Sequence, residues 1–209
     1  STTLHVRGLI RRVEVLDEVS SGVAFEARWT EFRDALLARP DVERTLLLLF
    51  AAGVRHEALR SLALAFDRNW DLVEERVPAA SPPPPDARPL VAAALLAVEQ
   101  ACADVADCTD PDDLLAGKLH AVLDYVARVR GVTDELDLLE LLPNEGKAPG
   151  VTFRLGTGGK GACWPGGAER VKAVKAEVRA AGDALEAVRG TVIDAAAHHL
   201  GAAIREFTL

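Results

Sequence analysis

The 209-residue sequence is poor in the residues that favour β-strands. Aromatic residues make up only 5% of it, and it has one tyrosine and no methionine. Alanine and leucine dominate the apolar residues instead, and these are the strongest helix formers, whereas aromatic and β-branched residues favour strands. The apolar fraction of 49% lets a chain of this length bury a core. The composition therefore predicts an all-α fold.

Cysteine is also scarce. Cys102, Cys108 and Cys163 are odd in number and form no C-x-x-C pair, so we expect no disulfide framework and a reducing, cytoplasmic setting. No continuous apolar run reaches the ~20 residues that cross a bilayer, and the N-terminus does not resemble a signal peptide. We expect a cytoplasmic location and no membrane partner. The absence of methionine indicates a segment of a longer protein.

Positive charge is in deficit. The formal net charge is −8 and the sequence pI is about 5.2. A domain that binds the DNA backbone along a broad face is expected to be basic, because neutralised phosphates supply most of the affinity. Any contact with nucleic acid must therefore be local, or must be made by neighbouring domains.

The sequence lacks a complete catalytic motif. The run GTGGKG at 156–161 follows a strand-like segment, but a phosphate loop would need glycine in place of Arg154 and a hydroxyl residue in place of Gly161. No G-x-S-x-G motif is present, and the adjacent His198 and His199 lie on different faces of a helix. We expect no metal, no bound cofactor and no ATP hydrolysis in this segment by itself.

Helical periodicity and capping residues divide the chain into helices with short breaks. Asp110 and Thr133 are expected to cap two of them, and Gly190-Thr191 is expected to interrupt the last one. The expected helices cover about 17–38, 40–53, 56–66 with a continuation to 76, 89–106, 110–130, 133–142, 168–189 and 191–207.

Two segments are not expected to be helical. Residues 81–89 contain four consecutive prolines, 82–85, and predict a semi-rigid polyproline connector. Residues 143–167 are rich in glycine and proline with one strand-like run, 151–155. They predict a loop or small β excursion that projects from the helices, followed by C-terminal helices over 168–207.

Cations gather around this second segment within an otherwise acidic chain. Phe153 and Trp164 lie among them. A flexible loop with cations and an aromatic ring can contact a nucleic-acid backbone and stack on a base; the alternative is a solvated loop without a ligand. The cations are Lys147, Arg154, Lys160, Arg170, Lys172 and Lys175.

Several segments together resemble the UvrD/RecB/AddA group of superfamily 1 DNA helicases, and specifically the helical 1B subdomain of actinobacterial members. The resemblance covers most of residues 13–209. It is carried by VEVLDEV at 13–19, AFEARW at 24–29, LLLLFAAGV at 46–54, LRSLA at 59–63, NWDL at 69–72 and GKGACWPG at 159–166. In addition, STTLH at 1–5 resembles helicase motif Ia, which would make residues 1–12 the edge of motor domain 1A.

The resemblance implies a parent enzyme that couples ATP and Mg²⁺ to 3′-to-5′ movement on DNA in repair or recombination. This segment would guide or contact DNA beside the motor. An alternative is a protein-interaction module that docks a partner subunit of a helicase–nuclease without touching DNA. The candidate DNA-contacting residues are Thr3, His5, Lys147, Arg154, Lys160, Trp164 and Lys172.

Overall fold

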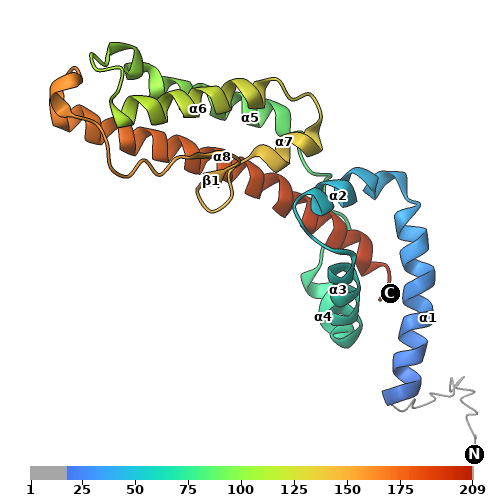
Figure 1. Ribbon diagram of the computed structural model, residues 1–209. Coiled ribbons are helices and arrows are strands. Elements are labelled where there is room, and N and C mark those ends of the chain that lie inside the picture. Colours follow the sequence, from blue (N-terminus) through green and yellow to red (C-terminus); the bar gives the residue numbers. More distant parts are fainter. Residues whose placement is uncertain (1–17, 209) are drawn as a thin grey trace, which may run out of the picture.

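The computed structural model describes residues 18–208, which are mainly helical, as the composition predicts (Figure 1). The α-helices are α1 (Glu18–Leu37), α2 (Pro40–Ala51), α3 (His56–Arg68), α4 (Trp70–Arg76), α5 (Ala87–Cys102), α6 (Leu114–Arg130), α7 (Glu135–Leu141) and α8 (Gly167–Arg205). Two 3₁₀ helices are η1 (Ala103–Asp107) and η2 (Gly161–Cys163). The two short strands are β1 (Lys147–Ala148) and β2 (Val151–Thr152).

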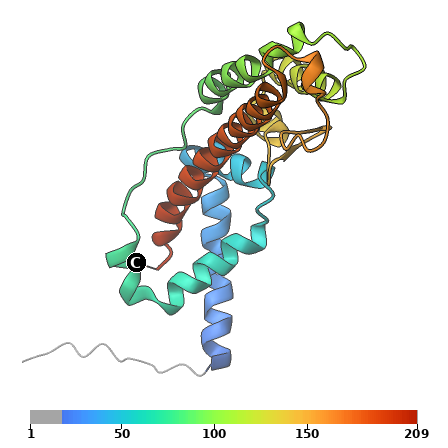
Figure 2. The same ribbon diagram turned by 90° about the vertical axis from the view of Figure 1, so that its left-hand side faces the viewer.

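Helix α8 is the axis of the molecule. Its 39 residues extend from one end of the fold to the other. The first half packs against α5 and η2, beside α6 and the hairpin; this part is named the α5–α7 lobe. The second half packs against α2 and α3 near the chain terminus, in the α1–α4 lobe (Figures 1 and 2). One helix thus connects two lobes that lie far apart along its length.

The expected break at Gly190 is wrong, because α8 continues through it. The Thr191 hydroxyl donates to the Ala187 carbonyl at 2.9 Å, one turn back, and Val192 is completely buried. Glycine inside a helix costs about 1 kcal/mol relative to alanine. Tertiary packing on both sides of Gly190 exceeds that cost, so the helix is not interrupted.

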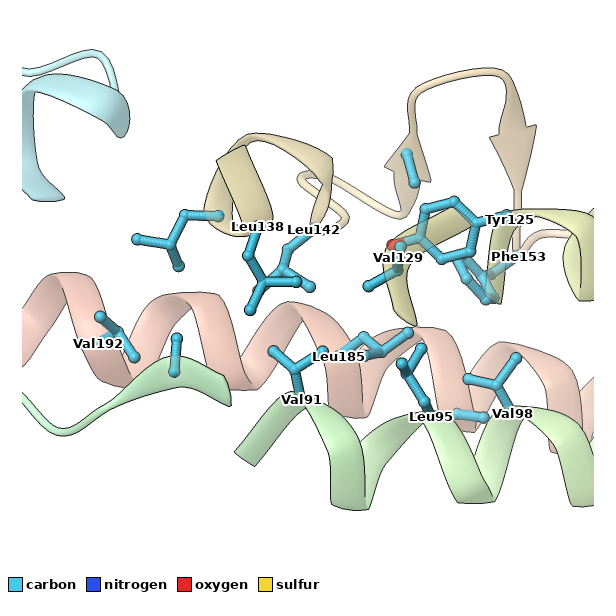
Figure 3. Packing of buried hydrophobic residues seen from close by; sticks show 14 of the residues in the cluster. Val91, Leu95, Val98, Tyr125, Val129, Leu138, Leu142, Phe153, Leu185 and Val192 are labelled. Atoms are coloured by element: carbon cyan, nitrogen blue, oxygen red, sulfur yellow. The ribbon is translucent and has the colours of Figure 1, made fainter. Parts of the chain in front are cut away.

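The α5–α7 lobe has a core built from four helices and the hairpin segment. Val91, Leu95 and Val98 repeat at helical spacing along the inner face of α5 and point toward α8. Figure 3 shows these side chains beside Leu185 of α8. The ring of Tyr125 on α6 meets the ring of Phe153 edge-on, with centroids 5.6 Å apart. The lobe is therefore packed through its full thickness.

One ion pair joins the two lobes. Arg44 on α2 contacts Glu135 on α7 through two hydrogen bonds of 2.8 and 2.9 Å, and also donates to the Pro84 and Pro85 carbonyls. The Arg44 guanidinium lowers the pKa of Glu135, and the hydrogen bond from the Ala87 amide lowers it further. Burial of the carboxylate acts in the opposite direction. The proline connector is consequently fixed to both lobes.

The starts of α5 and α7 differ from those expected by one or two residues. Asp86 caps α5, accepting from the Arg88 amide at 2.9 Å, so the last three residues of the expected 81–89 connector belong to that helix. Asp134 rather than Thr133 caps α7. In both cases a carboxylate stands at the cap, where it also interacts favourably with the positive end of the helix dipole.

Candidate nucleic-acid interface

The part of the glycine-rich segment that follows the hairpin is inlaid between α6 and α8. The β excursion within 143–167 is confirmed: Lys147 pairs with Thr152 and Ala148 with Val151 in an antiparallel hairpin. Beyond the hairpin, the chain runs between the two helices, where Gly159 contacts Leu115 of α6 and Val171 of α8. The expectation of a projecting loop is wrong for this later part, because buried side chains such as Phe153 anchor it.

Close approach explains why this inlaid segment, residues 153–161, is rich in glycine. A Cβ at Gly159, which has φ +86°, would lie 2.6 Å from Val171 Cγ1. A Cβ at Gly161 would lie 2.7 Å from the Ala168 backbone nitrogen. Both distances are below those that real Cβ atoms show, and a positive φ also disfavours a side chain. Gly159 and Gly161, which imitate part of a phosphate loop, therefore serve backbone packing.

Asp113 fixes the end of the inlaid segment to the start of α6. Its side chain is 2% exposed. One carboxylate oxygen accepts from the Leu115 and Ala116 amides, and the other accepts from the Lys160 amide at 2.8 Å. Burial alone would raise the pKa of Asp113, but these three amides outweigh it and the pKa is lowered. The cap expected at Asp110 is thus three residues further along.

Replacement of Asp113 by alanine should lower the free energy of unfolding by about 2–4 kcal/mol, because it removes a helix cap and leaves the Lys160 amide unsatisfied. Asp112→Ala, at an exposed neighbour, is the matched control and should cost under ~1 kcal/mol. Since the folded pKa of Asp113 is depressed, its stabilisation is present above the unfolded value near 3.8 and is lost as pH falls through the folded value. Urea unfolding at pH 7 and at pH 3 measures both effects.

Three cationic side chains from α6 and α8 donate hydrogen bonds to backbone carbonyls of the inlaid segment and the hairpin. Lys175 donates to the Gly156 and Gly158 oxygens at 2.9 and 2.7 Å, and Lys118 donates to Thr157 from the other side. Arg128 donates to the Pro149 oxygen at 2.8 Å. Because carbonyls are neutral, these contacts order the cations without cancelling their charge.

Further cations expected at the site are exposed around the same segment. Lys147, Arg154 and Lys172 are solvent-exposed and, within residues 18–208, have no carboxylate within 4.0 Å. Lys160 is 72% exposed and pairs with Asp110 at 3.1 Å. Arg170 is bound by two acids, Asp104 and Glu177, and so contributes little free positive charge.

The expectation that an aromatic ring of this segment stacks on a base is wrong for this structure. Trp164 is 4% exposed and Phe153 only 1%. Phe153 covers Gly182 of α8, where even a methyl group would lie 2.4 Å from its ring carbon Cγ. Both rings gain more from burial in the core than from contact with water. Trp164 is therefore a core residue, while Lys147, Arg154, Lys160 and Lys172 remain candidates.

Sequence reasoning missed Lys118 and Arg128. Its candidates Thr3 and His5 lie outside the residues that the structure describes. Lys118 lies 39 residues before its partner Thr157, so no local motif could group them. Lys118 is assigned to the site by its hydrogen bond from α6 to the inlaid segment, which exists only in the folded chain.

Three packed segments each carry an excess of positive charge, in contrast to the acidic chain as a whole. Helix α6 carries three Lys or Arg against one acid, residues 143–166 carry three against one, and α8 as far as Gly182 carries four against two. Residues 77–113, by contrast, carry one cation and seven acids. The surface made by α6, residues 143–166 and the first half of α8 is named the cationic face.

Comparison with protein-family models, with curated proteins and with solved structures finds no match to this chain. The cationic face and the residues that form it are therefore the features of this chain that point to a function.

Proposed function

We propose that this chain is the 1B-like accessory domain of an ATP-dependent 3′-to-5′ DNA helicase or helicase–nuclease, and that its cationic face binds the DNA backbone beside the motor. The observation that carries the proposal is the excess of positive charge in α6, residues 143–166 and the first half of α8 of an acidic chain. Within it Lys147, Arg154 and Lys172 are exposed and, among residues 18–208, have no carboxylate within 4.0 Å. ATP and Mg²⁺ would be bound by the parent enzyme outside this segment.

The chemistry of the face favours phosphate over base recognition. Its exposed cations are ammonium and guanidinium ions, which bind phosphate oxygens. The rings of Tyr125, Phe153 and Trp164 are buried, so they cannot act as stacking platforms. Binding would therefore be independent of sequence and sensitive to salt, which suits a domain that guides DNA as it moves.

The chain should bind duplex DNA weakly, with a Kd of roughly 1–100 μM in low salt. About four phosphate contacts would give a slope of log K against log salt near −3.6, or a roughly 100-fold loss between 50 and 200 mM NaCl. Fluorescence anisotropy with duplex, single-stranded and forked DNA measures both quantities. Absence of binding at 50 mM NaCl, or a slope near zero, would remove the DNA-contact role.

The alternative is that the chain docks a partner subunit. It is supported by a groove whose lining is mainly apolar, unlike the cationic face. The groove has a volume of about 540 Å³ and lies between α5, the end of α6 and α7. Leu96 is 54% exposed within it, beside the exposed Ala92 and Ala93.

The stretch Ala87–Asp107 is also long and apolar enough to span a membrane, with a mean hydropathy of 1.5, although its Val91, Leu95 and Val98 lie in the core.

Exposed apolar surface of this kind marks association sites. DNA binding and partner docking are distinguishable, because Leu96→Glu should weaken association with a partner subunit and leave DNA affinity unchanged. Loss of DNA binding in that variant would mean that the two surfaces are not independent.

A further inference from the structure

The three cysteines differ sharply in their surroundings. Cys102 is completely buried at the end of α5, and burial raises its pKa to about 11. Cys108 and Cys163 are half-buried, and all three thiols are free. A buried thiol of high pKa is unreactive, because the thiolate is the nucleophile. Only Cys108 and Cys163 are therefore open to exchange with a solvent thiol or disulfide.

Cys108 and Cys163 belong to two segments that meet at the start of α8. The connection from η1 to α6 passes η2 at the same end of the molecule (Figures 1 and 2). The Thr109 amide donates to the Cys163 carbonyl at 3.0 Å, and the Thr109 hydroxyl donates to the same oxygen at 3.3 Å. These bonds hold the two segments side by side.

The backbone contact brings the main chains of the two cysteines close together. Standard covalent geometry around the 3.0 Å bond from Thr109 to Cys163 keeps the Cα atoms of Cys108 and Cys163 less than about 8 Å apart. Disulfides join Cα atoms about 4.4–6.8 Å apart. Both sulfurs also point to one residue: Cys108 Sγ lies 3.4 Å from the Asp110 carbonyl oxygen, and Cys163 Sγ lies 4.0 Å from Asp110 Oδ2.

We infer that Cys108 and Cys163 form a redox-active dithiol that small-molecule disulfides such as oxidised glutathione convert to an intramolecular disulfide. One cysteine thiolate attacks oxidised glutathione, forms a mixed disulfide and releases one glutathione thiolate. The second cysteine thiolate then attacks the protein sulfur of that mixed disulfide and releases the other. Two electrons pass from the protein to glutathione, and the two thiol protons pass to the released glutathione thiolates.

The disulfide would cross-link two segments at one end of the cationic face. It would connect the η1–α6 linker to η2, next to Lys160 and its partner Asp110. The closed loop exceeds 50 residues, and cross-links that close long loops restrict the unfolded chain most. Oxidation would thus stabilise the start of α6 together with the inlaid segment, whether or not the face binds DNA.

Mass spectrometry tests the pairing directly. The 209-residue chain is equilibrated at pH 8 in buffers of graded reduced and oxidised glutathione, acid-quenched, unfolded and alkylated. Oxidised wild type and Cys102→Ser should both lose two hydrogens and yield one peptide pair joining Cys108 to Cys163. Cys108→Ser and Cys163→Ser should give only glutathione adducts. Glutathione adducts alone in the wild type, or a pair that includes Cys102, would overturn the inference.

Thermal unfolding gives an independent readout. The oxidised wild type should melt at least roughly 5 °C above its reduced form, and dithiothreitol should reverse the shift. Cys163→Ser, under the same oxidising buffer, should show no such rise. An oxidised wild type that melts at or below the reduced protein would show that the cysteines are not placed for a bond in the native fold.

Discussion

Reversing three charges on the cationic face, with Lys147→Glu, Arg154→Glu and Lys172→Glu combined, should lower DNA affinity at least about 30-fold at 50 mM NaCl. The slope of log K against log salt should fall by about 3, because each phosphate contact contributes about one unit. The three side chains are exposed and lack carboxylate partners within the described residues. The melting temperature should therefore change little, and anisotropy titrations over a salt series measure the effect.

The matched control carries the same change in net charge on the other lobe. Arg55, Arg68 and Arg76 are likewise exposed and have no acid within 4.0 Å among residues 18–208. Their combined replacement by Glu should reduce affinity less than about 3-fold, through long-range repulsion that salt screens. Equal losses in the two triple variants would mean that net charge, and not the cationic face, governs binding.

Two glycine-to-alanine substitutions in the same helix should change stability in opposite directions. Gly182→Ala places a methyl group 2.4 Å from Cβ and Cγ of the buried Phe153 ring, and overpacking of this kind costs about 1–3 kcal/mol after the gain in helix propensity. Gly190→Ala meets nothing within 4 Å and should stabilise by about 0.5–1 kcal/mol. Urea unfolding measures both free energies.

The pair isolates tertiary packing, because residue type, helix and substitution are identical. Gly201→Ala, which also meets nothing within 4 Å, should behave like Gly190→Ala. Combining Gly182→Ala with Phe153→Leu should cost less than the sum of the two single changes, since the smaller side chain relieves the clash. A stabilising Gly182→Ala would contradict the placement of Phe153 against α8.

The packing of the glycine-rich segment also bears on how the face would work. Lysines on α6 and α8 are held by the carbonyls of residues 156–158, so their positions are set before any ligand arrives. Ordered cations lose less side-chain entropy on binding than mobile ones. The segment is thus better suited to keep these lysines in fixed positions than to fold around DNA.

Local chemistry in the sequence determined much of the secondary structure. Alanine and leucine at helical spacing indicated the all-α class, and the prolines before Asp86 marked the connector. The excess of Lys and Arg after residue 143 also marked the neighbourhood of the cationic face. These features depend on residues close together in the chain, and the forces that act on them do not change when the rest of the fold is added.

Only the tertiary structure decided what contacts between distant residues control. Packing on both sides of Gly190 preserved α8 as one helix. Burial of Trp164 turned an expected base-stacking residue into part of the core. The neighbours of Gly159 explain a glycine that resembled part of a nucleotide site. The free energy of burial depends on which surfaces meet, and that is set by the whole chain.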